Sequence, residues 1–324
     1  MKGPSKQAKP SRNPLAGDTR LGVSGKQDVG KAEHLGDLTA RKSALGELDP
    51  GLYLVATPIG HASDISLRAL AVLAGVDQIA AEDTRVTAKL LSIHGISRPL
   101  IPYNDHNAAS VRPRLLEKLK AGARIALVSD AGTPLVSDPG YKLVRAVLAD
   151  GIPLHAVPGP SAVLAGLMLS GLASDRFLFA GFLSAKPGER KAVLEELKNV
   201  PATLIFFESA QRLGDSLAAM QEVLGARPAV MAREMTKLHE EVRRGTLGEL
   251  AAHYAKAVPP KGEVTLLVAP PTQAKADFGK IDAALDAALP FMPLKAASDM
   301  IAALLDTPRK EIYARGLAKK NAFR

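Results

Sequence analysis

The sequence contains no cysteine and no long apolar run. Without cysteine, disulfide bonds, thiolate metal sites and mechanisms that use a cysteine nucleophile are excluded. The best apolar candidate, AVLAGLMLSGLA, is too short to span a membrane. The first residues, MKGPSKQAKPSRNPLAG, lack the apolar core of a secretory signal. We therefore expect a cytoplasmic protein that does not span a membrane.

Several common catalytic motifs are absent as well. There is no G-x-x-x-x-G-K-[ST] phosphate loop, no G-x-G-x-x-G after a strand and no G-x-S-x-G nucleophile elbow. The seven histidines are scattered and form neither H-x-x-x-H nor H-E-x-x-H. We therefore expect no metal, no ordinary dinucleotide site and no serine hydrolase.

Basic residues exceed acidic ones, and the formal net charge is +9. The excess is spread along the chain, except that the last sixteen residues, RKEIYARGLAKKNAFR, hold six basic residues against one acid. Such a balance is compatible with an anionic partner. Basic excess alone is weak evidence for one.

With 324 residues and 47% hydrophobic composition, the chain is long enough for two domains. Residues 1–50 show no sustained apolar period, so we expect a disordered extension. Residues 51–160 alternate strand and helix patterns, which predicts an α/β domain with a largely parallel sheet. Residues 161–271 predict a second α/β domain with a mixed sheet, and residues 272–324 a helical segment.

Local signals predict where individual helices begin. A helix over residues 65–74 is expected to take Asp64 as its N-cap, and another to begin near residues 83–84 and end at Gly95. Towards the C-terminus, the apolar periodicity predicts helices at about residues 277–289, 294–305 and 308–318.

Short segments rich in proline, glycine and aspartate follow the apparent strands: ATPIG, AEDTR, SDAGTP, VPGPSA and FES. In open α/β sheets, ligands bind where such loops converge at the carboxyl ends of the strands. Gly132 and Gly159 allow the backbone to approach a ligand closely, and Pro58 stiffens its loop. In the longest loop, VSDAGTPLVSDPG at residues 128–140, we expect the first half to contact the ligand. The second half, SDPG, is expected to be the capped start of the next helix.

These segments, extended by their neighbours, resemble the motifs of a known family. LVATPIGHASDISLRAL, AEDTR, VSDAGTPLVSDPGYKLV, VPGPSA, FFES, REMTKLHEE and GEVTLLV occur in this order in the 16S ribosomal RNA 2′-O-ribose (cytidine) methyltransferases of the tetrapyrrole-methylase superfamily. The resemblance covers about residues 52–271, with a weaker likeness in the C-terminal helices. It implies two α/β domains of tetrapyrrole-methylase type with S-adenosylmethionine in the cleft between them, and a homodimer.

The activity that the resemblance implies is 2′-O-methylation of a cytidine ribose in 16S ribosomal RNA, within the 30S subunit. Direct displacement at a sulfonium needs alignment but no protein nucleophile, so the lack of cysteine is compatible with it. The alternative within the superfamily is methylation of a tetrapyrrole or of a translation-factor residue. The Gly-Thr-Pro form of the loop, AEDTR and FES speak against that alternative.

Two functions outside the superfamily fit less well. An aspartyl-phosphate phosphatase would use Asp130 as nucleophile, but the second aspartate of D-x-D-x-[TV] is missing because Gly132 stands there. A DNA-binding helix-turn-helix in the C-terminal helices would leave the donor-type loops unexplained.

The resemblance places donor contacts on loops of both domains. Gly132, Thr133 and Pro134 stand where the tetrapyrrole enzymes of the superfamily have Gly-Asp-Pro beside the donor. The residues expected to contact the donor are Pro58, Asp130, Ala131, Gly132, Thr133, Pro134, Ser161, Ala162, Phe207, Ala232 and Thr265. The chain departs from the family pattern at two places. Ala210 and Gln211 replace the usual Pro-His, which argues against a histidine base there, and His61 replaces an expected asparagine.

Polar residues beside these loops are the candidates for catalysis and RNA binding. A carboxylate could accept the proton of the hydroxyl group, and arginine or lysine could hold RNA phosphates. The catalytic candidates are Glu82, Asp83, Arg85 and Glu208, and the substrate-binding candidates are Arg212, Lys237, Arg315 and Lys319. Structural roles compete with several of these: Asp83 can cap its helix, Arg85 can pair with Glu82, and the C-terminal helix can be a solvated face.

Overall fold

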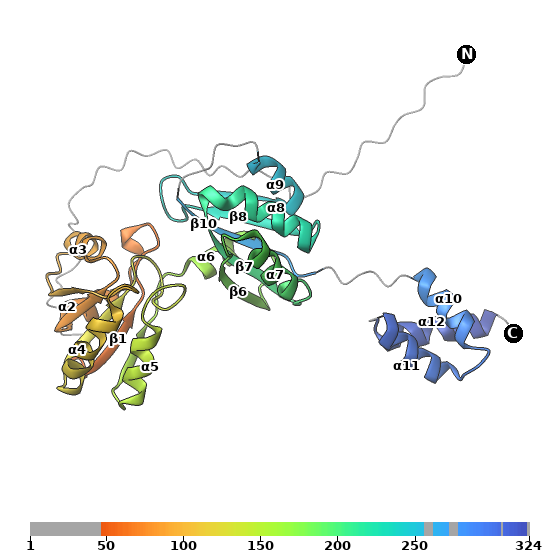
Figure 1. Cartoon of the computed structure of the whole chain (residues 1–324), viewed down its shortest axis with the longest axis horizontal. Coiled ribbons are helices and arrows are strands. Elements are labelled where there is room, and N and C mark those ends of the chain that lie inside the picture. Colours follow the sequence, from red (N-terminus) through yellow and green to blue (C-terminus); the bar gives the residue numbers. More distant parts are fainter. Residues whose placement is uncertain (1–46, 256–261, 272–277, 306, 323–324) are drawn as a thin grey trace, which may run out of the picture. The chain divides into compact units, whose positions relative to one another are not determined.

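The computed structural model describes residues 47–255, 262–271, 278–305 and 307–322. The chain divides into two compact units, residues 1–270 and 271–324. The larger unit contains two five-stranded sheets, and the smaller one contains helices (Figure 1). Most of the predicted disordered extension lies outside the described residues. Among the described residues, no helix is long and apolar enough to cross a membrane.

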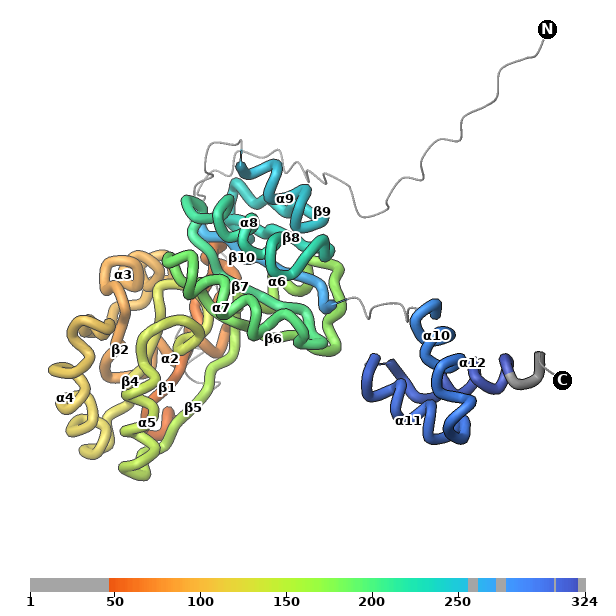
Figure 2. The backbone as a smooth tube through the Cα atoms, turned by 45° about the vertical axis from the view of Figure 1, so that its right-hand side comes forward, coloured from red at the N-terminus to blue at the C-terminus, as the bar shows by residue number. Residues whose placement is uncertain are grey.

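The first sheet is parallel throughout and has the strand order β3-β2-β4-β1-β5. Its strands and the helices that connect them are β1 (Gly51–Val55), α2 (Leu67–Gly75), β2 (Gln78–Ala81), α3 (Thr84–Ile93), β3 (Leu100–Pro102), α4 (Ala108–Lys120), β4 (Arg124–Val128), α5 (Tyr141–Ala149) and β5 (Leu154–Val157). The helices cover both faces of the sheet (Figures 1 and 2). The predicted parallel α/β architecture is confirmed.

This topology reverses direction between the neighbouring strands β1 and β4. The chain leaves β1 towards α2, which packs in one apolar core, and leaves β4 towards α5, which packs in the other. Such a switch point opens a crevice at the carboxyl ends of the two strands, where ligands of open α/β sheets bind. The loops that follow β1 and β4 are therefore the first place to look for a site.

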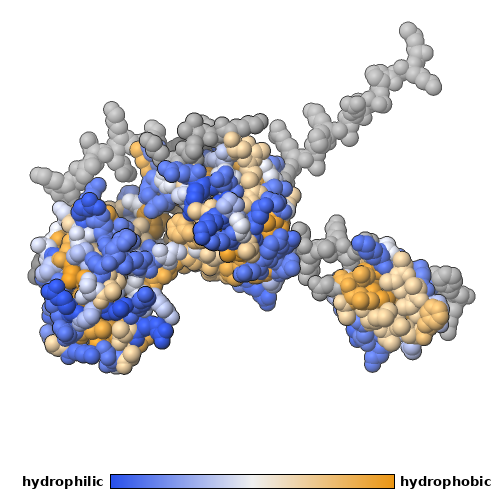
Figure 3. Space-filling model, viewed as in Figure 1, coloured by the Kyte–Doolittle hydropathy of each residue, from blue (hydrophilic) through white to orange (hydrophobic). Residues whose placement is uncertain are grey.

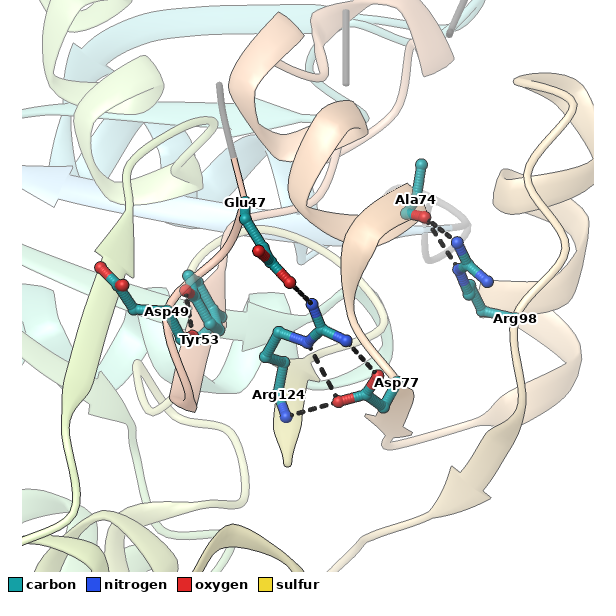
Figure 4. Close-up of polar contacts among 7 residues, drawn as sticks. All are labelled: Glu47, Asp49, Tyr53, Ala74, Asp77, Arg98 and Arg124. Carbon is teal, nitrogen blue, oxygen red and sulfur yellow. Dashed lines mark hydrogen bonds and ion pairs between the residues drawn. The ribbon is translucent and has the colours of Figure 1, made fainter. Parts of the chain in front are cut away.

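The opposite end of the first sheet is closed by polar contacts (Figure 4). Arg124, at the start of β4, binds both carboxylate oxygens of Asp77 at 2.8 and 3.1 Å. Tyr53 donates a hydrogen bond of 2.7 Å to the carbonyl of Asp49, and Arg98 donates to the carbonyl of Ala74. These side chains at the amino end of the sheet bind groups of neighbouring segments. We therefore look for a ligand site in the loops at the carboxyl end.

The second sheet is mixed, as predicted, with the order β6-β7-β10-β8-β9. Among its described strand pairs, β6–β7 is parallel and the other three are antiparallel. Its elements are α6 (Ala162–Ser170), β6 (Phe177–Phe182), α7 (Pro187–Leu197), β7 (Thr203–Ser209), α8 (Leu213–Leu224), β8 (Pro228–Arg233), β9 (Glu241–Thr246), α9 (Leu247–Tyr254) and β10 (Glu263–Val268). Helices α7, α8 and α9 pack on one face and α6 on the other.

The smaller unit consists of α10 (Phe278–Ala288), α11 (Leu294–Leu305) and α12 (Arg309–Ala322), close to the three helices predicted. They surround a core built around Leu285, Ile301 and Ile312. Apolar residues also gather on one visible face of this unit (Figure 3). Phe291 and Leu304 are among the exposed large apolar side chains of the unit.

Two predicted helix starts need correction. Helix α2 begins at Leu67 with Ser66 as N-cap, because the Ser66 side chain accepts a hydrogen bond from the Ala69 amide, whereas Asp64 ends a short 3₁₀ helix. Helix α5 begins at Tyr141 after Gly140, which has φ 130°, and no side chain caps it. SDPG is therefore not a capped helix start. The prediction for α3 is confirmed, with Asp83 as its N-cap.

Candidate functional site

The loops that follow β1 and β4 are joined at the switch point. Thr57 and Gly132 form an isolated antiparallel bridge, with N–H···O distances of 2.9 and 3.0 Å in the two directions. The buried Thr57 hydroxyl also donates to the carbonyl of Ser129 at 3.1 Å. Gly132 has φ 81°, a left-handed conformation that favours glycine. The bridge fixes the two predicted ligand loops against each other.

The rest of loop 128–140 holds an unusual backbone. Leu135 and Ser137 have φ 75° and 65°, although neither is glycine. At Gly140, an added Cβ would lie 2.7 Å from side-chain atoms of Leu127 and Leu135, so the position also needs glycine for lack of space. Left-handed conformations in non-glycine residues are costly and occur often at functional sites. Ser137 and Gly140 lie in the SDPG segment that the sequence predicts to be a helix start, and Leu135 lies just before that segment.

A cavity of about 270 Å³ opens beside this loop, and residues from both sheets line it. We call it the first cavity. Seven predicted site residues line it: Ala131, Thr133, Ser161, Ala162, Phe207, Glu208 and Thr265. Eight lining residues were not predicted: Val136, Ser137, Asp138, Phe182, Ser209, Gly262, Glu263 and Val264. The aromatic rings of Phe182 and Phe207 lie 5.6 Å apart in an edge-to-face arrangement.

The other predicted donor residues lie around this cavity without lining it. Gly132 and Pro134 belong to its loop, whereas Pro58 and Asp130 line a second cavity described below. Ala232 is fully buried in β8, where it pairs with Thr265 and packs against Ile59 and Met235. Ala232 therefore supports the wall from behind.

Asp138 is one of the eight lining residues that the sequence argument missed. Burial raises the pKa of its carboxyl group to about 6, while a hydrogen bond from Ser129 acts in the opposite direction. Sequence patterns do not mark Asp138 as a site residue, because aspartate before Pro-Gly is also typical of an ordinary turn. The left-handed turn at Ser137 and the cavity beside it appear only in three dimensions.

The second cavity, also about 270 Å³, lies on the other side of the β4 exit loop. It is lined by Thr57, Pro58, Ile59, Gly60 and Ala62 after β1, by Val86, Thr87, Lys89, Leu90 and Ile93 of α3, by Ser129 and Asp130 after β4, and by Lys237. Its wall on α3 is largely apolar, and Lys89 and Lys237 add two cations. The β4 exit loop separates the two cavities, because its residues Ser129 and Asp130 line the second cavity and its residues Ala131 and Thr133 line the first.

The predicted acidic candidates form a connected group at the carboxyl end of β2. The Glu82 carboxylate accepts a hydrogen bond from the Asp130 amide at 3.3 Å, and the Asp130 carboxylate accepts one from the Asp83 amide at 2.9 Å. Burial raises the pKa of both Glu82 and Asp130. These contacts hold the loops after β2 and β4 together.

Asp83 and Arg85 form a local ion pair. The Asp83 side chain accepts from the Arg85 amide at 2.8 Å and pairs with the Arg85 guanidinium at 2.6 Å. Hydrogen bonds from Arg85 lower the pKa of Asp83 to about 2. The partner of Arg85 is thus Asp83 and not Glu82, because the N-cap position brings the Asp83 carboxylate to the first turn of α3. The pair is exposed and lines neither cavity.

Glu208 and Arg212 bind each other at 2.7 Å. Glu208 is 2% exposed and also accepts hydrogen bonds from the Ser216 hydroxyl at 2.5 Å and the Ser209 amide at 2.7 Å. Arg212 donates to the carbonyl of Leu183 at 3.1 Å. Both predicted side chains therefore brace the end of β7 beside the first cavity.

Lys237 follows β8 on a strained turn in which Glu234 and Thr236 have φ 49° and 64°. Lys237 binds Glu234 at 3.0 Å and Glu263 at 3.3 Å. Burial lowers the pKa of Lys237, but these two carboxylates outweigh that effect and raise it. The lysine thus stays charged where it lines the second cavity.

The turn that carries Lys237 contacts the loop after β1. The His61 amide donates to the Thr236 hydroxyl at 3.0 Å. An added Cβ on Gly60 would lie 2.5 Å from Thr236 Oγ1 and 2.8 Å from the Met235 carbonyl. His61 itself caps the 3₁₀ helix at Ala62–Asp64 by accepting from the Ser63 amide. Parts of both sheets therefore meet at the rim of the second cavity.

The remaining predicted RNA contacts lie in the helical unit and bind acidic residues there. Arg315 forms two hydrogen bonds of 2.6 Å with Asp282 and stacks over the Phe278 ring at 4.5 Å. Lys319 binds Asp286 at 2.6 Å. These pairs connect α12 to α10. The departures from the family pattern, buried Ala210 and exposed Gln211, line neither cavity.

No cluster of histidine, aspartate or glutamate that could hold a metal occurs in the part of the chain that the structure describes. The two cavities share one loop at the switch point of the first sheet. The first cavity is partly apolar and aromatic, and the second is lined in part by Lys89 and Lys237. This arrangement can hold two substrates side by side.

Comparison with known proteins identifies the family of the chain. The family model of the Tetrapyrrole (Corrin/Porphyrin) Methylases matches residues 51–251, and that of the RsmI C-terminal HTH domain matches residues 275–320. The chain is 52% identical over 276 residues to the ribosomal RNA small subunit methyltransferase I of Mesorhizobium japonicum, covering 85% of this chain and 94% of that protein. It is 50% identical over 273 residues to the protein of the same name from Erythrobacter litoralis, covering 84% and 96%.

Solved structures share the fold at lower identity. The crystal structure of uroporphyrin-III-C-methyltransferase from Thermus thermophilus has a TM-score of 0.51 and 22% identity, and the match covers 68% of this chain and 94% of that one.

Proposed function

The chain belongs to the tetrapyrrole methylase family, and within it to the ribosomal RNA small subunit methyltransferases I, and from this we propose that it methylates the 2′-hydroxyl of a cytidine ribose in 16S ribosomal RNA. S-adenosylmethionine is the methyl donor. The enzyme is an rRNA (cytidine-2′-O-)-methyltransferase.

The observation that carries the proposal is the pair of cavities on the two sides of loop 128–140. Methyl transfer to a hydroxyl needs two bound substrates whose reacting atoms lie in line. The first cavity suits the donor, because it is walled by aromatic rings, small side chains and the glycine-containing loop. Bound there, the donor supplies an electrophilic methyl group on a positively charged sulfur.

The second cavity suits the acceptor nucleotide. Its apolar wall on α3 can pack against a base, and Lys89 and Lys237 can attract RNA phosphates. Among the predicted RNA contacts, Lys237 is the one that lines this cavity. We keep Arg212, Arg315 and Lys319 as proposed RNA contacts, although each also serves an ion pair within its own unit.

Of the donor contacts proposed from the loops, Pro58 and Asp130 face the second cavity and Ala232 lies behind the wall of the first, so the proposal rests on the others: Ala131, Gly132, Thr133, Pro134, Ser161, Ala162, Phe207 and Thr265. The catalytic candidates remain Glu82, Asp83, Arg85 and Glu208. We also propose the domain limits 51–160 and 161–271, a homodimer, action on the 30S subunit and a cytoplasmic location. Methylation of a tetrapyrrole or a translation-factor residue is not favoured, because the close relatives carry the name of a ribosomal RNA enzyme.

One assay tests this function. Purified protein is incubated with methyl-labelled S-adenosylmethionine and 30S subunits, naked 16S RNA or a tetrapyrrole precursor. We expect label in the ribose of one cytidine of the 30S RNA. Label on the base, label on the tetrapyrrole, or no donor binding by calorimetry would each contradict the proposal.

A further inference from the structure

Three carboxylates line the first cavity: Asp138, Glu208 and Glu263. Glu208 is held by Arg212, Ser216 and the Ser209 amide, and Glu263 binds Lys237 and is 79% exposed. Asp138 has no ion-pair partner among the described residues. It is therefore the one carboxylate of the three whose oxygens are not already committed to a cation of the protein.

The position of Asp138 relative to the two cavities is a second observation. Ser129, which lowers the pKa of Asp138, is 3% exposed and lines the second cavity, where its hydroxyl also donates to the carbonyl of Ala131 at 3.4 Å, whereas Asp138 lines the first cavity. The Asp138–Ser129 pair thus forms part of the wall where the two cavities approach each other. An acceptor hydroxyl in line with the methyl group of the donor must lie at such a wall.

We propose that Asp138 is the catalytic base that accepts the proton of the ribose 2′-hydroxyl, and that Ser129 positions it. This inference rests on the proposed function. As the new oxygen–methyl bond forms, the sulfur–methyl bond breaks and the sulfonium becomes a neutral thioether. The hydroxyl proton passes to the Asp138 carboxylate, so atoms and charge balance. Ser129 acts through its hydrogen bond and is a positioning residue.

The surroundings of Asp138 suit a base that works near neutral pH. Burial is the main cause that raises its pKa to about 6, and the negative charges of Glu82, Asp130 and Glu263 add to that effect. Glu208, in the same wall, is joined to Arg212. A base with a pKa slightly below the working pH is both ionised and basic enough to take a proton.

The test compares Asp138→Asn with Asp150→Asn. Asp150 lies at the other end of α5, pairs with Lys120 and lines neither cavity. Donor affinity is measured by calorimetry and single-turnover methyl transfer to 30S subunits is measured from pH 5 to 8.5. We expect Asp138→Asn to bind the donor within about threefold of wild type but to transfer about 10²–10⁴-fold more slowly. Asp150→Asn should behave as wild type.

The pH profile separates a base from a structural residue. The wild-type rate should rise with a midpoint near 6, and that rise should vanish in Asp138→Asn. Ser129→Ala removes a hydrogen bond that favours the carboxylate, so its midpoint should move to higher pH while donor affinity is kept. This variant keeps the proposal testable if Asp138→Asn does not fold.

Three results would overturn the assignment: an unchanged rate in Asp138→Asn, a loss of donor affinity as large as the loss of rate, or an unmoved midpoint in Ser129→Ala. In each of them the wild-type protein still methylates the 30S subunit. Failure of the proposed function is recognised differently, because the wild-type protein itself would then transfer no label to ribose.

Discussion

The two cavities have the same size, about 270 Å³, but their walls are built differently. The first draws its lining from both sheets and contains two aromatic rings. The second is lined almost entirely by the first sheet's loops and α3, and its one residue from the second sheet is the cation Lys237. A small donor binds best in a cavity that matches its shape, whereas a nucleotide within a large RNA needs a cavity that the RNA can reach and positive charge beside it. The difference in lining thus matches a difference in substrates.

The largest effect that would test this comparison is expected from Gly132→Val. A branched side chain at φ 81° strains the loop by about 1–3 kcal/mol, and relief of that strain would shift the neighbouring cavity-lining residues Ala131 and Thr133, so we expect donor affinity to fall about 5- to 150-fold. Gly122→Val is the matched control, because Gly122 has φ 87° with no atom near its Cβ position and lines neither cavity. It should lower stability and leave donor affinity unchanged. If calorimetry gave the wild-type donor affinity for folded Gly132→Val, the loop would not be part of the donor site.

The next effect concerns the second cavity alone. Lys237→Gln should weaken binding to 30S subunits about tenfold at low salt and reduce the slope of log affinity against log salt by about one. Donor affinity should not fall. Lys191→Gln, which removes an exposed ion pair with Glu222, should change neither. Equal salt slopes for Lys237→Gln and wild type would show that RNA phosphates bind elsewhere.

A third, smaller effect concerns stability and the half-buried carboxylate of Asp138 in the first cavity. The folded pKa of Asp138, about 6, lies above its ordinary value of 3.8, so the stability linked to this group is present below pH 3.8 and lost as pH rises through 6. Asp138→Asn should therefore be more stable than wild type at pH 7.5. Allowing for solvent screening we expect about 1 kcal/mol, or about 2–4 °C in Tm. The gain should shrink towards pH 4 in thermal melts; a variant less stable at pH 7.5 would contradict the assigned burial.

The smallest effect is expected at the aromatic wall. Phe182→Leu loses the edge-to-face contact with Phe207, and a contact of this kind contributes about 0.5–1.5 kcal/mol. We expect a few-fold weaker donor affinity. Phe177→Leu, on the same strand but outside the cavity lining, is the control. Equal affinities for the two variants would indicate that the donor does not reach Phe182.

Much of the fold could be predicted from local patterns. Strand and helix alternation indicated the parallel sheet, and the tight spacing of later strands indicated the mixed one. Helix starts were less secure, since Asp64 and Ser66 are both good caps and packing decides between them. The choice of Ser66 depends on where Ala69 and Leu70 enter the core.

The site could likewise be predicted only where it depends on local patterns. Loops at strand ends could be located from the sequence, and Ala131, Thr133 and Ser161 of these loops line the first cavity. Asp138 was missed because its setting depends on Ser129, nine residues away in the same loop. Lys237 was predicted, but its ion pair with Glu263 in β10 was not. Likewise, sequence patterns cannot show that Arg315 and Lys319 bind Asp282 and Asp286 across the helical unit.

The Lys237–Glu263 ion pair has its cation in the wall of one cavity and its carboxylate in the wall of the other. An RNA phosphate that draws Lys237 away would leave Glu263 without that positive neighbour. The first cavity would then be more negative, which favours a positively charged sulfonium over the neutral thioether product. By linkage the effect runs both ways, so donor binding would in turn strengthen RNA binding. A single lysine would thus make each substrate sensitive to the presence of the other.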